Sequence, residues 1–247
     1  MATYLGVDWA GSCWLVVAAG DEPTVTTEPS FLNVWHEHGH DAASVLVDIP
    51  IGLPERGTRA CDEAAMDVLG PRRSTVFAIP SREVVETDDY DTARELNGDT
   101  LASQSWWLFP RIREVDVFLQ ENEDATDHVY ESHPEVCFAK LATEPLPPKD
   151  TNDGRDERLA LLADAPALHK RIDTVLTERE DGTEWHDRIS VGKRDDLLDA
   201  AVLAYTAQQL ELGSRETDQT YPHLPEDPAE DDELGLPMEI IYPEMKR

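Results

Sequence analysis

The sequence predicts an α/β fold in which a mixed five-stranded sheet, an antiparallel meander plus parallel strands, is flanked by helices. Three features predict it: short strand-like segments near the start, a continuously apolar segment further on, and amphipathic segments between and after them. The 247 residues, 40% of them hydrophobic, suffice for one sizeable core. We therefore expect one domain over residues 1–212, followed by an acidic, proline-rich tail over residues 213–247 that lies on the surface.

The strands are expected in two groups. Residues 4–10 and 12–19 are strand-like segments joined at Gly11, and residues 24–27 complete a meander. Residues 44–49 are apolar without alternation and end at Pro50, a pattern typical of a strand buried on both faces. A fifth strand is expected over residues 128–131.

The helices are expected from apolar residues at helical spacing. A weak pattern covers residues 31–43, and a long one over residues 100–121 contains Pro110 as a kink. The clearest stripe runs through the last helix, over residues 195–212. The other expected helices are residues 59–69, 136–142, 155–163 and 166–178.

The charge is strongly acidic. The chain has 52 acidic and 21 basic residues, a formal net charge of -31, and only five lysines. Such a surface is typical of proteins that stay soluble in concentrated salt, where the repulsion between like charges is screened. The negative charge of such a surface repels phosphate. We therefore expect any nucleic acid to be held by metal ions and a local arginine patch.

The location of the protein is predicted from what the sequence lacks. The start of the chain has no basic region followed by an apolar stretch and a cleavage site, and no apolar run approaches the length of a membrane span. We expect a cytoplasmic protein without a membrane partner.

Two aspartates occupy strand positions that are costly for a charge. Asp8 sits inside an apolar strand, and Asp48 ends the next buried strand. A buried carboxylate costs several kcal/mol unless it is paired or binds a cation. Either residue alone could instead cap a loop or pair with an arginine.

The last helix and the fifth strand supply further acids. Asp196 and Asp199 are three residues apart and share a helix face, although acids there could also cap the helix N-terminus. Glu131 ends a strand, whereas Glu135 lies in a first helical turn. Carboxylates select magnesium or manganese, so we expect one or two Mg²⁺ or Mn²⁺ ions. The predicted metal ligands are Asp8, Asp48, Asp196 and Asp199, and Glu131 completes the predicted catalytic set.

Basic and histidine residues suggest a substrate site. An arginine-rich stretch follows Asp48, and its side chains could bind phosphate oxygens or pair with neighbouring acids such as Asp62. His133 lies between Glu131 and Glu135 and is a candidate proton shuttle. The predicted phosphate-binding residues are Arg59, Arg72, Arg73 and Ser74.

Several segments together resemble the domain of unknown function 429 family, which is regarded as a predicted nuclease family of ribonuclease H-like fold. They are Gly6-Val7-Asp8-Trp9, Val47-Asp48-Ile49-Pro50-Ile51-Gly52-Leu53, Arg59-Ala60-Cys61-Asp62, residues 70–77, Glu131-Ser132-His133-Pro134-Glu135 and Asp195-Asp196-Leu197-Leu198-Asp199-Ala200. The acidic composition suggests a haloarchaeal-type member. In the wider superfamily, which includes Holliday-junction resolvases, an aspartate of the first strand, an acid near the fourth and an Asp-x-x-Asp of the last helix bind the metals. The resemblance implies these roles for Asp8, Asp48, Asp196 and Asp199.

The leading hypothesis is therefore a metal-dependent nuclease that uses a two-metal carboxylate mechanism. One alternative is an ATP-dependent phosphotransferase of actin-like fold, but the 13 glycines form no phosphate-binding cluster. Another is a non-catalytic module that binds metal or nucleic acid.

Overall fold

The computed structural model describes residues 2–180, 194–217, 219–227 and 229–244. Its central feature is a five-stranded sheet of order β3-β2-β1-β4-β5. β1, β2 and β3 pair antiparallel, whereas β4 and β5 continue the sheet parallel to β1. The predicted mixed sheet is thus confirmed. The strands are β1 (Tyr4–Trp9), β2 (Trp14–Ala19), β3 (Thr24–Glu28), β4 (Ser44–Val47) and β5 (Val129–Glu131).

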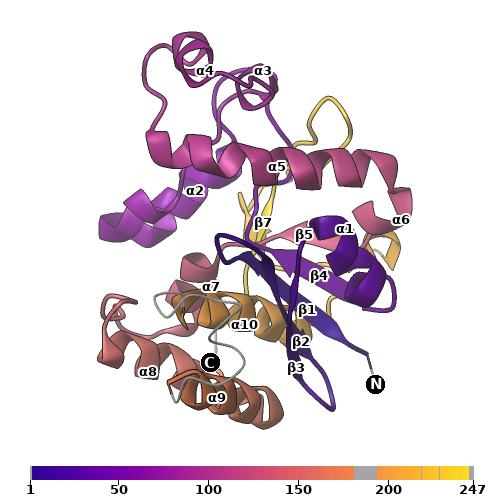
Figure 1. Ribbon diagram of the computed structural model, residues 1–247, viewed down its shortest axis with the longest axis vertical. Helices are drawn as coiled ribbons and strands as arrows, with labels where there is room; N and C mark the ends of the chain where they lie inside the picture. The colour runs from indigo at the N-terminus through magenta and orange to yellow at the C-terminus, as the bar shows by residue number, and fades with distance from the viewer. Residues whose placement is uncertain (1, 181–193, 218, 228, 245–247) are drawn as a thin grey trace.

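Helices cover both faces of this sheet (Figure 1). One face packs against α5 (Ser103–Glu121) and α1 (Phe31–Val34), and the other against α10 (Arg194–Gln209) and α7 (Pro134–Leu141). The remaining helices are α2 (Ala60–Leu69), α3 (Arg82–Val85), α4 (Tyr90–Leu96), α6 (Glu123–Thr126), α8 (Asn152–Leu161) and α9 (Pro166–Glu180), with 3-10 turns at Gly70–Thr75 and Arg215–Thr217.

The weak helical pattern after Phe31 gives less helix than expected. α1 is capped by Ser30, whose hydroxyl accepts a hydrogen bond from the Asn33 backbone N–H. A single π-helical turn follows at Trp35–Gly39. A Cβ atom added at Gly39 would lie 2.6 Å from the Trp35 ring. Because glycine has no side chain, the π-helical turn, which is wider than an α-helical one, can close over the indole.

α10 is buried far more completely than an amphipathic surface helix. Its residues from Asp196 to Ala207 are all buried, whereas the sequence suggested a single apolar stripe. The helix lies between the sheet on one side and α7, α8 and α9 on the other, which explains this burial (Figure 1). Small residues such as Ala200 and Ala204 allow this close packing.

Gly6 sets the distance between β1 and α10. A Cβ at Gly6 would lie 2.0 Å from the Ala200 carbonyl oxygen and 2.3 Å from the Ala204 nitrogen. The strand and the helix backbone therefore touch at this point. Side chains two residues apart on a strand share a face, so Asp8 also points toward α10.

The segment after residue 212 is part of the fold, contrary to the expected surface tail. β6 (His223–Leu224) pairs with β7 (Ile240–Ile241), and both residues of β7 are buried. The Ile241 carbonyl accepts a hydrogen bond of 2.7 Å from Ser132, directly after β5. The apolar side chains of this segment thus dock it against the sheet despite its acidic composition.

In the part of the chain that the structure describes, no helix is both long and apolar enough to cross a membrane.

Candidate metal centre

The parallel strands bring their acidic ends to one edge of the sheet. Val7 of β1 is paired with Val47 of β4, and Val47 with Glu131 of β5. The next positions, Asp8 and Asp48, therefore lie side by side at the carboxyl ends of these strands. This edge is where ligand sites gather in open α/β sheets.

α10 adds two acids to this edge from its first turns. One ligand oxygen each of Asp8, Asp196 and Asp199 lies within 4.8 Å of the others. All three side chains are buried, with exposed fractions of 8%, 6% and 4% respectively. Three of the four predicted metal ligands therefore converge, and the contact of Gly6 with α10 is the reason that they meet.

The crowding of carboxylates raises their pKa values. Burial, and then the charges of Asp48 and Asp199, raise the pKa of Asp8 well above its usual range. Burial and the charge of Asp199 raise the pKa of Asp48 to about 8. Asp48 lines the adjoining cavity but lies outside the group of three whose oxygens come within 4.8 Å.

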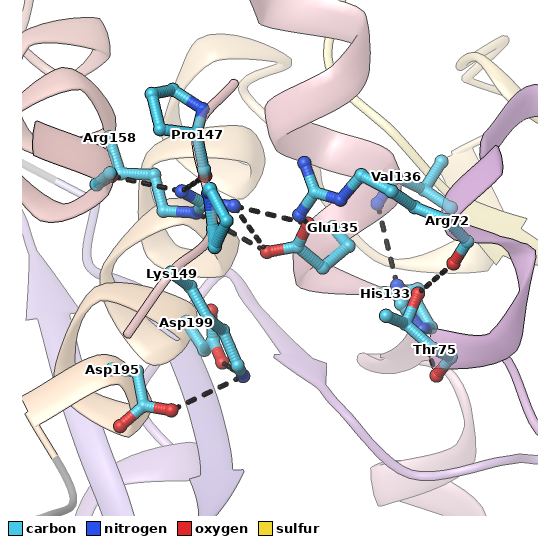
Figure 2. A network of polar contacts seen from close by, with 12 residues as sticks. Arg72, Thr75, His133, Glu135, Val136, Pro147, Lys149, Arg158, Asp195 and Asp199 are labelled. Carbon is cyan, nitrogen blue, oxygen red and sulfur yellow. Dashed lines mark hydrogen bonds and ion pairs between the residues drawn. The ribbon is translucent and has the colours of Figure 1, made fainter. Parts of the chain in front are cut away.

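The donor set fits a hard divalent cation. Oδ1 of Asp199 is buried and has no hydrogen-bond partner among the described residues. Its other oxygen, Oδ2, accepts a hydrogen bond of 2.8 Å from Lys149 Nζ, which also lies 3.5 Å from Asp195 (Figure 2). Carboxylate oxygens without nitrogen or sulfur donors favour magnesium or manganese. Asp8, Asp196 and Asp199 could therefore hold such an ion.

Glu131 and Arg59 form a buried ion pair beside this group. Arg59 Nη1 donates to Glu131 Oε2 at 2.6 Å, and Nη2 to Oε1 at 2.8 Å. The guanidinium also binds both oxygens of Asp62 and the Ile51 carbonyl, so all five of its N–H groups are engaged. The predicted phosphate contact of Arg59 is therefore not supported: the side chain is buried and has no donor left.

Glu131 has a supporting role in the same network. Its Oε2 also accepts a hydrogen bond of 2.7 Å from the Ile51 backbone N–H, and thus fixes the loop after Asp48. Burial raises its pKa to about 7, although Arg59 opposes the shift. With both oxygens occupied, Glu131 orients the site and is not among the three converging acids.

Arg72 lies beside the centre in a second ion-pair network (Figure 2). Glu135 lies between Arg72 and the buried Arg158, and its Oε1 accepts a hydrogen bond of 2.9 Å from Arg158 Nη2. Arg72 remains partly exposed, as expected for a side chain that can reach a substrate. Arg73 and Ser74 are exposed on the same 3-10 turn, immediately before the cavity-lining Thr75.

His133 is fixed by contacts at both ring nitrogens. Nδ1 accepts a hydrogen bond of 3.4 Å from the Val136 backbone and caps α7, so Nε2 carries the proton and faces the Thr75 carbonyl at 3.3 Å (Figure 2). Burial lowers the pKa of His133 to about 4. This geometry favours a positioning role over the predicted proton shuttle.

The family model described as "Protein of unknown function (DUF429)" matches residues 6–229, which is most of the chain. The chain belongs to this family. No curated protein and no solved structure matches it. The match extends past residue 212 and includes β6, in agreement with the packing of that segment in this DUF429 protein.

Two residues have roles in the DUF429 site that the sequence did not assign to them. Asp62, expected only as a possible partner of the arginine-rich stretch, is the second carboxylate on Arg59, and Lys149 reaches the metal centre from the loop before α8. Lys149 is 46 positions from Asp195 in the chain, and its loop is rich in proline and charge, so no local pattern linked it to the aspartates. The only available signal was the scarcity of lysine in the composition.

Proposed function

We propose that this DUF429 protein is a nuclease of ribonuclease H-like fold that hydrolyses phosphodiester bonds with Mg²⁺ or Mn²⁺. The observation that carries the proposal is the convergence of Asp8, Asp196 and Asp199 within 4.8 Å. Buried carboxylates at such distances repel one another, and a divalent cation relieves both the repulsion and the cost of burial.

The topology supports the assignment of the fold. The sheet has the order β3-β2-β1-β4-β5, with an antiparallel meander followed by two parallel strands, and the acids lie where β1 and β4 end. A long C-terminal helix with an Asp-x-x-Asp sequence then packs on β1. These are the features that the resemblance to ribonuclease H-like nucleases led us to expect.

The chemistry follows from the residues around the centre. A bound divalent ion would supply a water of lowered pKa and neutralise charge on the phosphate. Asp48 lines the adjoining cavity next to Asp8, where its carboxylate would bind the ion or orient the attacking water. Arg72, Arg73 and Ser74 would bind and orient phosphate groups from the neighbouring 3-10 turn.

The proposal is tested by incubating the full chain, in molar KCl with Mn²⁺ or Mg²⁺, with labelled single-stranded DNA, branched DNA, RNA–DNA hybrids and ATP. We expect metal-dependent cleavage of a polynucleotide. Asp199→Asn should lower the rate by more than about 100-fold, because it removes a metal ligand. The matched control is Asp67→Asn, an exposed aspartate of α2 that should not change the rate.

Equal rates for the wild type and Asp199→Asn would contradict the proposal, as would a complete lack of polynucleotide cleavage. Consumption of ATP without cleavage would favour a phosphotransferase instead.

A further inference from the structure

A cavity of about 160 Å³ adjoins the metal centre at the carboxyl edge of the sheet. Asp8 and Asp48, at the ends of β1 and β4, are among the residues that line it. The rest of its wall is largely apolar and comes from segments far apart in the sequence. These wall residues are Trp9, Val76, Phe77, Ile79, Leu108 and Ile240.

Two ring contacts hold Trp9, one of the two aromatic residues of this wall, in place. The guanidinium of Arg111 lies 4.4 Å from the centre of the Trp9 ring, and Trp14 contacts the same ring edge-on at 5.3 Å. Trp9 and Phe77 nevertheless remain partly exposed, and both line the cavity. The cavity thus offers fixed aromatic surface next to the metal centre.

The lining offers an anion no free cationic side chain. Four carboxylates line the cavity, and among the described lining residues the only arginine or lysine is Arg59, which is fully engaged with Asp62 and Glu131. A phosphate group would find no arginine or lysine to bind it within the cavity itself. A neutral group with apolar faces fits both the charge and the walls.

The size of the cavity limits this group to a small one. Pockets for drug-sized ligands measure roughly 300–1,000 Å³. The cavity is about half the lower value, which leaves room for one planar ring system without its sugar.

We propose that this cavity binds a single unpaired nucleobase, adjacent to the phosphate that the metal centre would hold. The inference rests on the proposed nuclease function and names its substrate class: a strand that is single or locally unpaired at the cleavage position. A paired base cannot enter without being unstacked, whereas an unpaired base can enter at much lower cost.

Stacking also suits the charge of this protein. Contacts to phosphate weaken steeply as salt rises, and a chain with a net charge of -31 repels a polyanion. Stacking of a base on an aromatic side chain does not depend on the charge of the base. The cavity would thus contribute affinity in concentrated salt, where phosphate contacts contribute little.

The test is an abasic scan. Single-stranded oligonucleotides, each with one abasic site at a different position, are bound by the full chain in molar KCl with Mg²⁺, and cleavage is followed in the same samples. Loss of one particular base should weaken binding by about 5- to 150-fold, the range expected for one stacked base. Loss of the other bases should have a much smaller effect.

Two variants assign this effect to the cavity. Phe77→Ala should abolish the sensitivity to the abasic position while Mg²⁺ binding, measured by calorimetry, is retained. Trp107→Ala is the matched control, because Trp107 is an aromatic residue of α5 that is 77% exposed and does not line the cavity. It should leave the scan unchanged.

The outcomes separate this inference from the proposed function. Three results would each overturn the inference. These are equal binding at all abasic positions, an unchanged scan in Phe77→Ala, and no binding of the oligonucleotides. Cleavage with a uniform scan would refute the base site alone. A position-sensitive scan without cleavage would support the base site and refute the hydrolytic function.

Discussion

Lys149 places an ammonium group against two acids of α10. Its Nζ lies 2.8 Å from Asp199 Oδ2 and 3.5 Å from Asp195 Oδ2. The neighbouring acids raise the pKa of Lys149 above its usual value, so the group is charged at neutral pH. The ammonium therefore offsets part of the carboxylate charge on the side of Asp199 that faces the loop carrying Lys149.

We predict that Lys149→Met strengthens Mn²⁺ binding and lowers the melting temperature of the metal-free protein. The variant removes a competing cation but leaves Asp199 without its ion pair. Because the lysine side chain is 40% exposed, we expect a modest effect on affinity, about 1 kcal/mol or roughly fivefold. Titration calorimetry and thermal unfolding measure the two effects. The exposed Lys170→Met is the control, and weaker Mn²⁺ binding by Lys149→Met would contradict the prediction.

The raised pKa of Asp48 predicts that the stability of the metal-free protein depends on pH. Its pKa is about 8 in the folded chain against 3.8 ordinarily, so the folded state holds more protons than the unfolded state between these values. Without metal, the free energy of unfolding should fall between about pH 6.5 and 8, by up to about 1 kcal/mol per pH unit. His133, with a pKa of about 4 when folded, is uncharged throughout this range.

Denaturant unfolding in EDTA measures this slope. Asp48→Asn should lessen it, with the remainder coming from Glu131 and Asp8, whose pKa values are also raised, and saturating Mg²⁺ should lessen it in the wild type by favouring the ionised carboxylates. A slope that Asp48→Asn leaves unchanged would show that other groups cause it.

The sequence alone was enough to predict site residues when their neighbours in the chain made them stand out. Asp8 and Asp48 stand out because each interrupts or ends an apolar strand, and Asp199 because it lies beside small residues within a helix. For Arg59 the sequence left open phosphate binding or pairing with Asp62; the structure shows the pair with Asp62, and the second partner, Glu131, lies 72 positions away. A sequence does not show which of several arginines a buried carboxylate will engage.

The contact between β1 and α10 is the structural element on which the centre depends. Gly6 and Asp8 lie on one face of β1, and the backbone of α10 crosses directly over Gly6. Any displacement of this helix would move Asp196 and Asp199 away from Asp8.

We therefore predict that Gly6→Ala both destabilises the protein and weakens metal binding. The new methyl group would lie 2.0 Å from a backbone oxygen, so the helix must move, and overpacking of this kind typically costs about 1–3 kcal/mol. Each kcal/mol should lower the melting temperature by roughly 2–4 °C in a chain of this size.

Gly213→Ala is the matched control, because its nearest contact to a new Cβ would be an ordinary 3.8 Å. If Gly6→Ala binds Mn²⁺ as tightly as the wild type, the contact does not set the geometry of the centre.

Apolar periodicity predicted most helices and strands, but the order of the strands in the sheet became known only from the structure. The expected strands and long helices are present within a few residues of their predicted ends. β6 and β7 were missed because two-residue strands carry no periodicity, and their proline-rich, acidic surroundings suggested a tail. Their pairing depends on contacts with β5 and α2, which no local pattern encodes.

At the scale of the whole molecule, the acidic residues form two populations. Most of the 52 acidic residues belong to the surface, but nine acidic side chains are buried among the described residues. Six of these nine form ion pairs with arginines, and these are Asp62, Asp116, Glu131, Glu135, Asp232 and Glu239. Asp8, Asp196 and Asp199, by contrast, converge on one another. The paired acids hold the fold together, and the convergent ones are available for a cation.

The most direct test of the account is calorimetric titration of Mn²⁺ into the full chain, in molar KCl so that weak binding to the acidic surface is screened. Wild type and the exposed-site control Asp67→Asn should show the same saturable binding. Asp8→Asn should bind at least about tenfold more weakly, because it removes one of three converging ligands. Equal binding by the wild type and Asp8→Asn would contradict the metal centre.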